Sequence, residues 1–112
     1  MNTIVYEDFE KVDIRVGRIV EVKDFERARQ PSYQLTIDFG PEIGIKRSSA
    51  QAGSDYIKQD LGGHLCLAVV NLPPRNIAGF QSEVLVLGVC RKNGGLSLLR
   101  PDDAAELGSR MY

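Results

Sequence analysis

Two consecutive prolines between two apolar segments constrain the fold of this chain most strongly. Pro73 and Pro74 follow Leu65–Val70, which has no polar side chain, and precede the apolar run Val84–Val89. Short runs without a polar face are typical of buried strands. Proline fixes φ and has no amide proton, so a helix between these runs is disfavoured. The sequence therefore predicts a rigid loop from Asn71 onward, which is either a plain turn or a rim that holds binding groups.

The first half of the chain has the alternation of strands. Apolar and polar residues alternate in Tyr33–Phe39, as in a strand with one buried face, and Ile45 extends that pattern after a turn. A longer strand is predicted for Val12–Phe25, with a bulge at Gly17 that turns Arg18 outward. Its apolar residues of one parity are expected to face the core: Ile14, Val16, Val20 and Val22.

The second half adds a short helix and a final hairpin. Gly53–Gln59 is expected to form the helix, with Ser54 as its N-cap, and Asn93–Gly95 a turn before a last strand, Leu96–Leu99. Together these elements predict a mainly all-β fold, a five- to six-stranded OB-fold barrel with one short helix and short terminal segments. With 112 residues, the chain is expected to form a single domain, residues 1–112.

The composition excludes several classes of protein. Apolar residues make up 43% and charged residues 26%, as in a soluble globular protein, and no apolar run is long enough for a membrane span. No secretory signal is visible, so cytoplasmic localisation is expected. Cys66 and Cys90 lie in apolar stretches and are interpreted as buried free thiols. With one histidine, His64, and no Cys-x-x-Cys, neither a metal site nor another cofactor is expected.

The charge is unevenly distributed along a chain whose formal net charge is −1. Residues 43–100 carry seven Lys/Arg and three Asp/Glu, whereas acidic residues outnumber basic ones on both sides of this segment. A local basic face can bind an anion although the whole chain is nearly neutral. A mixed, solvated surface remains the alternative.

Two polar clusters are candidates for a nucleic-acid site, and neither has the pattern of a catalytic one. The serines lack a neighbouring base, and no phosphate-binding Gly-rich loop is present, so no enzymatic activity is expected. The first cluster combines cations, hydroxyls and an amide, which suit phosphate and sugar contacts but also helix capping. Its residues are Lys46, Arg47, Ser48, Ser49 and Gln51.

The second cluster lies in the proline segment. Arg75 follows the two prolines, which limit its backbone freedom and the entropy lost on binding, and Asn71 and Ser82 bracket the same segment. These polar side chains either contact a ligand or satisfy loop backbone groups. Phe80 either stacks on a base or, with Arg75, contacts a bound polypeptide, or it packs beneath the loop.

The motifs that carry a family resemblance span nearly the whole chain. They include Asp13-Ile14-Arg15-Val16-Gly17, Ser48-Ser49-Ala50-Gln51 and Pro73-Pro74-Arg75-x-Ile77-Ala78-Gly79-Phe80-x-Ser82. By these motifs the chain resembles the tRNA-binding domain family, which includes free-standing dimeric proteins and OB-fold modules of tRNA synthetases. Within that family it resembles the CsaA group of export-related chaperones.

The resemblance implies a homodimeric, non-enzymatic protein of the bacterial cytoplasm that binds tRNA and unfolded or export-precursor polypeptides. A module that acts only on RNA, or as an accessory to a synthetase, is the alternative. Strands that are apolar on both faces also favour a homodimer, because the outer face needs a cover. Residues transferred from the family as tRNA contacts are Lys46, Ser48, Asn71, Arg75 and Ser82. Many tRNA-binding members have glycine followed by methionine two positions beyond the matching serine, whereas Glu83-Val84-Leu85 follow Ser82 here. The acid beside the site is expected to repel phosphate and so to weaken tRNA binding.

Overall fold

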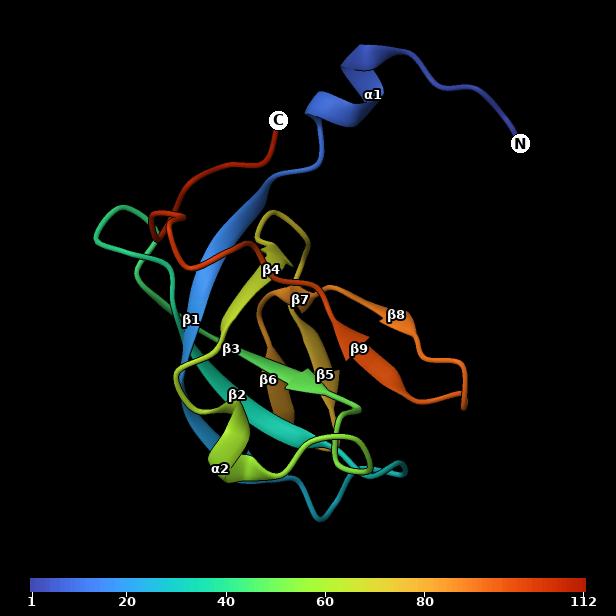
Figure 1. Cartoon of the computed structure of the whole chain (residues 1–112), viewed down its shortest axis with the longest axis vertical. Coiled ribbons are helices and arrows are strands. Elements are labelled where there is room, and N and C mark those ends of the chain that lie inside the picture. Colours follow the sequence, from blue (N-terminus) through green and yellow to red (C-terminus); the bar gives the residue numbers. More distant parts are fainter.

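The computed structural model describes residues 1–112 and confirms a mainly β architecture. Five antiparallel strands in the order β3-β2-β1-β4-β7 curl into a nearly closed barrel of the predicted OB type (Figure 1). Two two-stranded hairpins, β5–β6 and β8–β9, complete the fold. The elements are α1 (Tyr6–Glu10), β1 (Ile14–Asp24), β2 (Tyr33–Asp38), β3 (Ile45–Ala50), α2 (Lys58–Leu61), β4 (Leu65–Val69), β5 (Arg75–Ile77), β6 (Phe80–Ser82), β7 (Leu85–Val86), β8 (Gly88–Cys90) and β9 (Leu96–Leu98).

The first strand changes which side faces the barrel, and the predicted burial of Val20 is wrong. Ile19 is fully buried, whereas Val20 is 51% exposed. The register with β2 shifts between Ile19 and Glu21, so the bulge lies at Val20 rather than at the expected Gly17. Gly17 has another role, because a Cβ there would lie 2.5 Å from Cγ2 of Ile37. The missing side chain lets β1 pass close over the core. Arg18 is exposed, as predicted.

Alternation in β2 supplies most of the interior. Tyr33, Leu35, Ile37 and Phe39 are buried as predicted. Cys66 and Ala68 of β4 and Val84 complete the same cluster from the other wall. Ile45, by contrast, is 56% exposed, because the inward positions of β3 belong to Lys46, Ser48 and Ala50.

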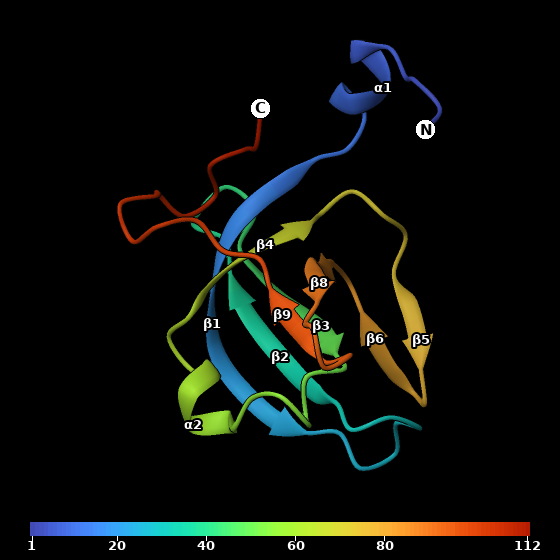
Figure 2. The same ribbon diagram turned by 45° about the vertical axis from the view of Figure 1, so that its right-hand side comes forward.

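The proline segment is a loop, as predicted, only over residues 71–74, and from Arg75 onward it forms a hairpin, β5–β6. Arg75 pairs with Ser82 and Ile77 with Phe80 across it. Its two-residue turn is Ala78-Gly79, and both residues have positive φ, 48° and 86°. That is the geometry of a type I′ turn, whose twist matches the twist of the two strands. The hairpin extends along one side of the barrel next to β3 (Figure 2).

Side chains close the barrel between β3 and the segment from Ser82 to Val84. Ser48 Oγ donates to the Val84 carbonyl at 2.9 Å, and the Ser49 amide donates to Ser82 Oγ at 3.2 Å. One backbone bond, from the Glu83 amide to the Arg47 carbonyl at 2.8 Å, joins β3 to the same segment. We call this set of contacts the seam. It takes the place of a regular ladder between β3 and β7, which do not pair.

Two further predictions of local structure are wrong. Residues 53–55 form a turn, and the helix α2 begins at Lys58 after an N-cap at Ile57 that makes no side-chain bond, so Ser54 is not a cap. The predicted strand Val84–Val89 is divided into β7 and β8. Leu87 donates its amide to Leu67 and accepts a bond from Leu99, so the chain passes there from one partner to another.

The two ends of the chain lie at the same end of the molecule. The short helix α1 has no buried residue and stands away from the barrel (Figures 1 and 2). The C-terminal tail instead pairs with β1 through a bridge between Arg15 and Arg110. Asp13 lies between these two cations, 2.6 Å from Arg15 and 3.6 Å from Arg110. Neither helix is long and apolar enough to cross a membrane.

The two cysteines differ in environment, so the prediction for one of them is wrong. Cys66 is fully buried against the core, and burial raises the pKa of its thiol to about 12. Cys90 ends β8 and is exposed. Strand β8 pairs only with β9, and all three of its residues are exposed.

Candidate nucleic-acid interface

Polar side chains gather on the outer face of β2 and β3. The register pairs Gln34 with Ser49 and Thr36 with Arg47. Leu35 and Ser48 are buried between them, so the alternation of the strands directs the four members of these two pairs outward. In OB folds this face, together with the loops that flank it, is the usual surface for oligonucleotides.

Arg47 lies at the centre of this face on an aromatic ring. Its guanidinium carbon is 4.4 Å from the centroid of the Phe80 ring. Phe80 is itself only 5% exposed and packs at 5.4 Å against Phe25 from the loop after β1. The prediction that Phe80 packs beneath the hairpin therefore describes the structure better than direct stacking on a ligand. The planar group that Phe80 supports and presents to solvent is the guanidinium.

A pocket of about 390 Å³ opens beside Arg47. It is bounded by residues 24–27 at the end of β1 and in the loop after it, by Gln34 and Arg47 on β2 and β3, and by residues 78–80 of the hairpin turn and β6. We call it the Arg47 pocket. A smaller hollow of about 160 Å³ adjoins it and shares Gln34, Arg47 and Phe80. Three segments far apart in the sequence thus meet around one arginine.

The charges around the Arg47 pocket are balanced. Arg27 and Arg47 supply two cations, and Asp24 and Glu26 supply two acids. Asp24 is already paired with Lys58 at 2.9 Å. The smaller hollow adds Lys23, which lies 3.7 Å from Glu21. The face is therefore suited to a ligand with polar edges and a planar group, and less to an isolated phosphate.

The structure separates the first predicted cluster into two sides of β3. Arg47 and Ser49 lie on the outer face, and Gln51, just after the strand, is exposed. Lys46 shares the inward parity with Ser48, so it does not extend the cationic surface around Arg47. Ser48 is fully buried and donates to the Val84 carbonyl, which makes it part of the seam.

The second cluster also divides. Arg75 is exposed on β5, whereas Ser82 Oγ accepts the Ser49 amide and belongs to the seam. Asn71 holds the N-terminal segment, since its side chain accepts the Asp13 amide at 3.0 Å and donates to the Lys11 carbonyl at 2.7 Å. Asn71, Ser48 and Ser82 are thus engaged in structural bonds, and Arg47 and Arg75 remain as exposed cations.

Several pocket residues were not predicted from the sequence. Arg27 lies in a charged loop that offered no motif, and Gln34 is the polar partner in an alternating strand. The available signal was the OB topology itself, which brings the loop after β1 and the segment before β7 together beside the outer face of β2 and β3.

The chain matches one protein family model and is similar to solved structures of two chaperones. The family model described as "Putative tRNA binding domain" matches residues 14–110. The structure is similar to a CsaA chaperone from Picrophilus torridus, with 50% identity, a TM-score of 0.92, and coverage of 98% of this chain and 100% of that one. It is also similar to a CsaA chaperone from Bacillus anthracis, with 42% identity, a TM-score of 0.91, and coverage of 99% and 100%.

Longer proteins match as well. A methionine–tRNA ligase from Nitrosomonas eutropha is 39% identical over 111 residues, which are 97% of this chain and 15% of the ligase. The chain therefore spans a small part of the curated relatives that it matches.

Proposed function

The chain belongs to the putative tRNA-binding domain family, and from that membership we propose that it is a non-enzymatic protein that binds tRNA. The binding surface in this proposal is the outer face of β2 and β3, with the Arg47 pocket at its centre and Arg75 on the adjoining hairpin. We propose that residues 1–112 act as one domain of this family's type.

The observation that carries the proposal is the position of Arg47. It lies 4.4 Å from the Phe80 ring at the place where the loop after β1, strands β2 and β3, and hairpin β5–β6 meet. A guanidinium held by an aromatic ring offers both a charge for phosphate and a flat surface for a base. Arg75 adds a second cation on the same hairpin that carries Phe80.

The proposal is tested by titrating labelled tRNA with the protein at several salt concentrations. Affinity should fall steeply as salt rises, because each neutralised phosphate releases counterions. Arg47→Ala and Arg75→Ala should each weaken binding by about 1–3 kcal/mol, the range for charge-assisted contacts. Arg100→Ala removes one exposed arginine outside the pocket and is the matched control. Absence of a complex in a gel shift at low salt would refute tRNA binding.

A second function, the binding of unfolded or export-precursor polypeptides, is favoured by exposed apolar side chains. Leu72, Leu85 and Val89 are 45–52% exposed on the segments around β5 to β8. Both CsaA chaperones are similar to this chain over nearly its whole length. If this function holds, the protein should suppress aggregation of a denatured test protein with little dependence on salt, since the contacts are apolar. Unchanged aggregation at a molar excess of the protein would contradict it.

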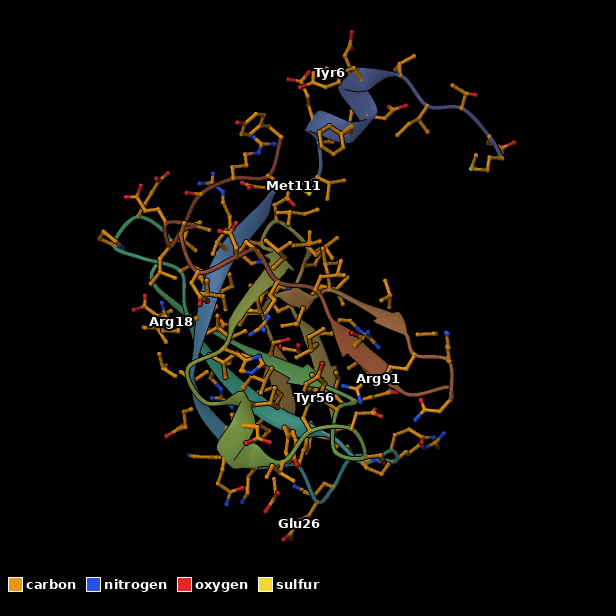
Figure 3. The ribbon with its side chains drawn as sticks, in the orientation of Figure 1. Tyr6, Arg18, Glu26, Tyr56, Arg91 and Met111 are labelled. Carbon is orange, nitrogen blue, oxygen red and sulfur yellow. The ribbon has the colours of Figure 1, made fainter.

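We also propose that the protein is a homodimer in the cytoplasm. Ile4, Val5 and Tyr6 are 63–66% exposed on an N-terminal segment that contacts little of its own barrel (Figure 3). A second copy would give this segment, and the exposed Val89 of β8, an apolar partner. Light scattering at micromolar concentration tests the assembly: a monomer mass would overturn it.

The match to methionine–tRNA ligases favours an accessory role as a further alternative. Because the chain spans only 15% of such a ligase, the role would be to bring tRNA to a separate catalytic chain. Co-purification of a synthetase with the protein, retained at moderate salt, would support it.

A further inference from the structure

The Arg47 pocket has features that distinguish between the parts of an RNA that could enter it. Its volume of about 390 Å³ lies at the lower end of the range for small-ligand sites. Only three of its nine lining residues are hydrophobic. Its cations and acids are equal in number, so a phosphate group entering it meets repulsion from Asp24 and Glu26 as well as attraction.

The floor of the pocket provides a place for stacking. Phe25 and Phe80 are each 5% exposed and form a support on which the Arg47 guanidinium lies. Arg47 itself is exposed and borders both the pocket and the smaller hollow beside it. Nucleobases that are not paired stack on guanidinium planes as they do on aromatic rings.

One side wall provides hydrogen bonding. Gln34 lies on the outer face of β2, borders both hollows and carries an amide that both donates and accepts. No intramolecular side-chain bond engages it, unlike Asp24, which is paired with Lys58. A phenyl or aliphatic group of a polypeptide would leave this amide without a partner, whereas the edge of a base would supply one.

We propose that the Arg47 pocket binds one unpaired nucleobase of an RNA, stacked on the Arg47 guanidinium with its edge toward Gln34. The inference rests on the proposed tRNA binding and specifies which part of the RNA enters the pocket. Phosphates on either side of the base lie at the rim of the pocket near Arg27 and over the adjoining hollow near Lys23. Because Gln34 both donates and accepts, the pocket takes each of the four bases.

The location of the pocket is consistent with access by a large RNA. Glu26, on the loop that bounds its mouth, lies at the end of the molecule opposite the two termini (Figure 3). The N-terminal segment proposed to contact a second copy is therefore remote from it. A dimer formed through that segment leaves both pockets open.

The test uses the full chain and three fluorescein-labelled RNA hairpins of one sequence. The first has a single-nucleotide bulge, the second has an abasic residue at the bulge, and the third is fully paired. Loss of the base should weaken binding roughly five- to tenfold, within the range measured for single stacked bases. The size of this loss, rather than the affinity alone, reports on the pocket.

Two variants assign the loss to the pocket. Arg47→Lys keeps the charge and removes the plane, so it should abolish the difference between the bulged and abasic hairpins while leaving the salt dependence unchanged. Gln34→Met, a change of similar volume on the surface, should reduce the same difference without affecting folding. Arg29→Lys lies in the loop after β1 but outside the pocket and is the matched control, which should keep the full difference.

The outcomes separate this inference from the proposed function. Equal binding of the bulged, abasic and paired hairpins overturns the base pocket, while tRNA binding stands if tRNA itself is bound. No binding of tRNA or of any hairpin at low salt overturns both. Two results together would make the pocket a polypeptide site and the inference wrong. An unfolded polypeptide would displace the bulged hairpin, and Gln34→Met would raise the affinity of the protein for that polypeptide.

Discussion

Arg47 and Glu83 exchange two hydrogen bonds across the seam. The Arg47 amide donates to Glu83 Oε1 at 3.0 Å, and the Glu83 amide donates to the Arg47 carbonyl at 2.8 Å. The carboxylate that the sequence places beside the candidate RNA site is therefore a structural acceptor. It fixes the backbone of the residue whose side chain forms the centre of the Arg47 pocket.

Replacing Glu83 should affect folding through this bond. Glu83→Ala removes the acceptor and leaves the Arg47 amide unpaired, so the free energy of unfolding should fall by about 1–2 kcal/mol. Glu83→Gln keeps an acceptor oxygen and should stay within about 0.5 kcal/mol of the wild type. Urea unfolding followed by circular dichroism measures both. Equal loss in the two variants would mean that the charge, rather than the bond, stabilises the seam.

Asn71 should act on the N-terminal segment and not on RNA. Asn71→Ala breaks the bonds to the Asp13 amide and the Lys11 carbonyl, so amide hydrogen exchange at residues 11–13 should accelerate while tRNA affinity changes little. Asn71→Asp keeps the acceptor for Asp13 and loses the donor to Lys11, and it should give an intermediate effect. A large loss of tRNA affinity with unchanged amide hydrogen exchange at residues 11–13 would mean that Asn71 contacts RNA.

Gly17 should not tolerate a side chain. A Cβ at this position would lie 2.5 Å from Cγ2 of Ile37 and 2.8 Å from Cε1 of Phe39. Gly17→Ala should therefore destabilise the fold by about 1–3 kcal/mol, as overpacking of a core does. Gly62→Ala is the control, because a Cβ at Gly62 meets nothing within 4 Å. Thermal unfolding of the two variants compares them directly, and similar midpoints would refute the close approach of β1 to β2.

Cys66 should make the fold sensitive to alkaline pH. Burial raises the pKa of its thiol to about 12, so in the native state it keeps its proton above pH 9, where the unfolded thiol loses it. Fewer protons are then bound in the unfolded state, and stability must fall as pH rises. The loss is about 1.4 kcal/mol per pH unit between roughly pH 9 and 12.

The measurement is the denaturation midpoint against pH in two matched variants. Cys66→Ala should flatten the decline above pH 9, and Cys90→Ala, which removes the exposed thiol, should retain it. Parallel curves for both variants would show that other groups cause the alkaline loss.

Local patterns predicted the strands that bury one face, because the alternation of apolar and polar residues within such a strand determines which side chains face the core. Tyr33–Phe39 alternates regularly and lies in the core as expected. Val20 was misassigned because the bulge beside it depends on how β1 wraps around β2, which alternation within β1 does not encode. The hairpin at Ala78-Gly79 was not predicted, because the two prolines indicate a loop and give no information about the strand that begins directly after them.

The sequence indicated two separate clusters around Lys46 and Arg75 but not how they meet. The structure brings one residue of each together, because Arg47 lies over the Phe80 ring. A serine in a strand is expected on the surface, yet Ser48 is buried. Its hydroxyl donates a hydrogen bond to the carbonyl of Val84, 36 positions away, which satisfies the group inside the barrel. Contacts over such separations depend on the closed barrel and cannot be inferred from neighbouring residues.

The seam also bears on how such a barrel can change over evolutionary time. A ladder of backbone bonds is nearly indifferent to which side chains occupy it. This closure instead depends on Ser48, Ser82 and Glu83, so each can be altered by a single codon. A point substitution at one of these residues can therefore change the width of the Arg47 pocket while the rest of the barrel is kept. Ligand preference can then diverge among relatives without any change of topology.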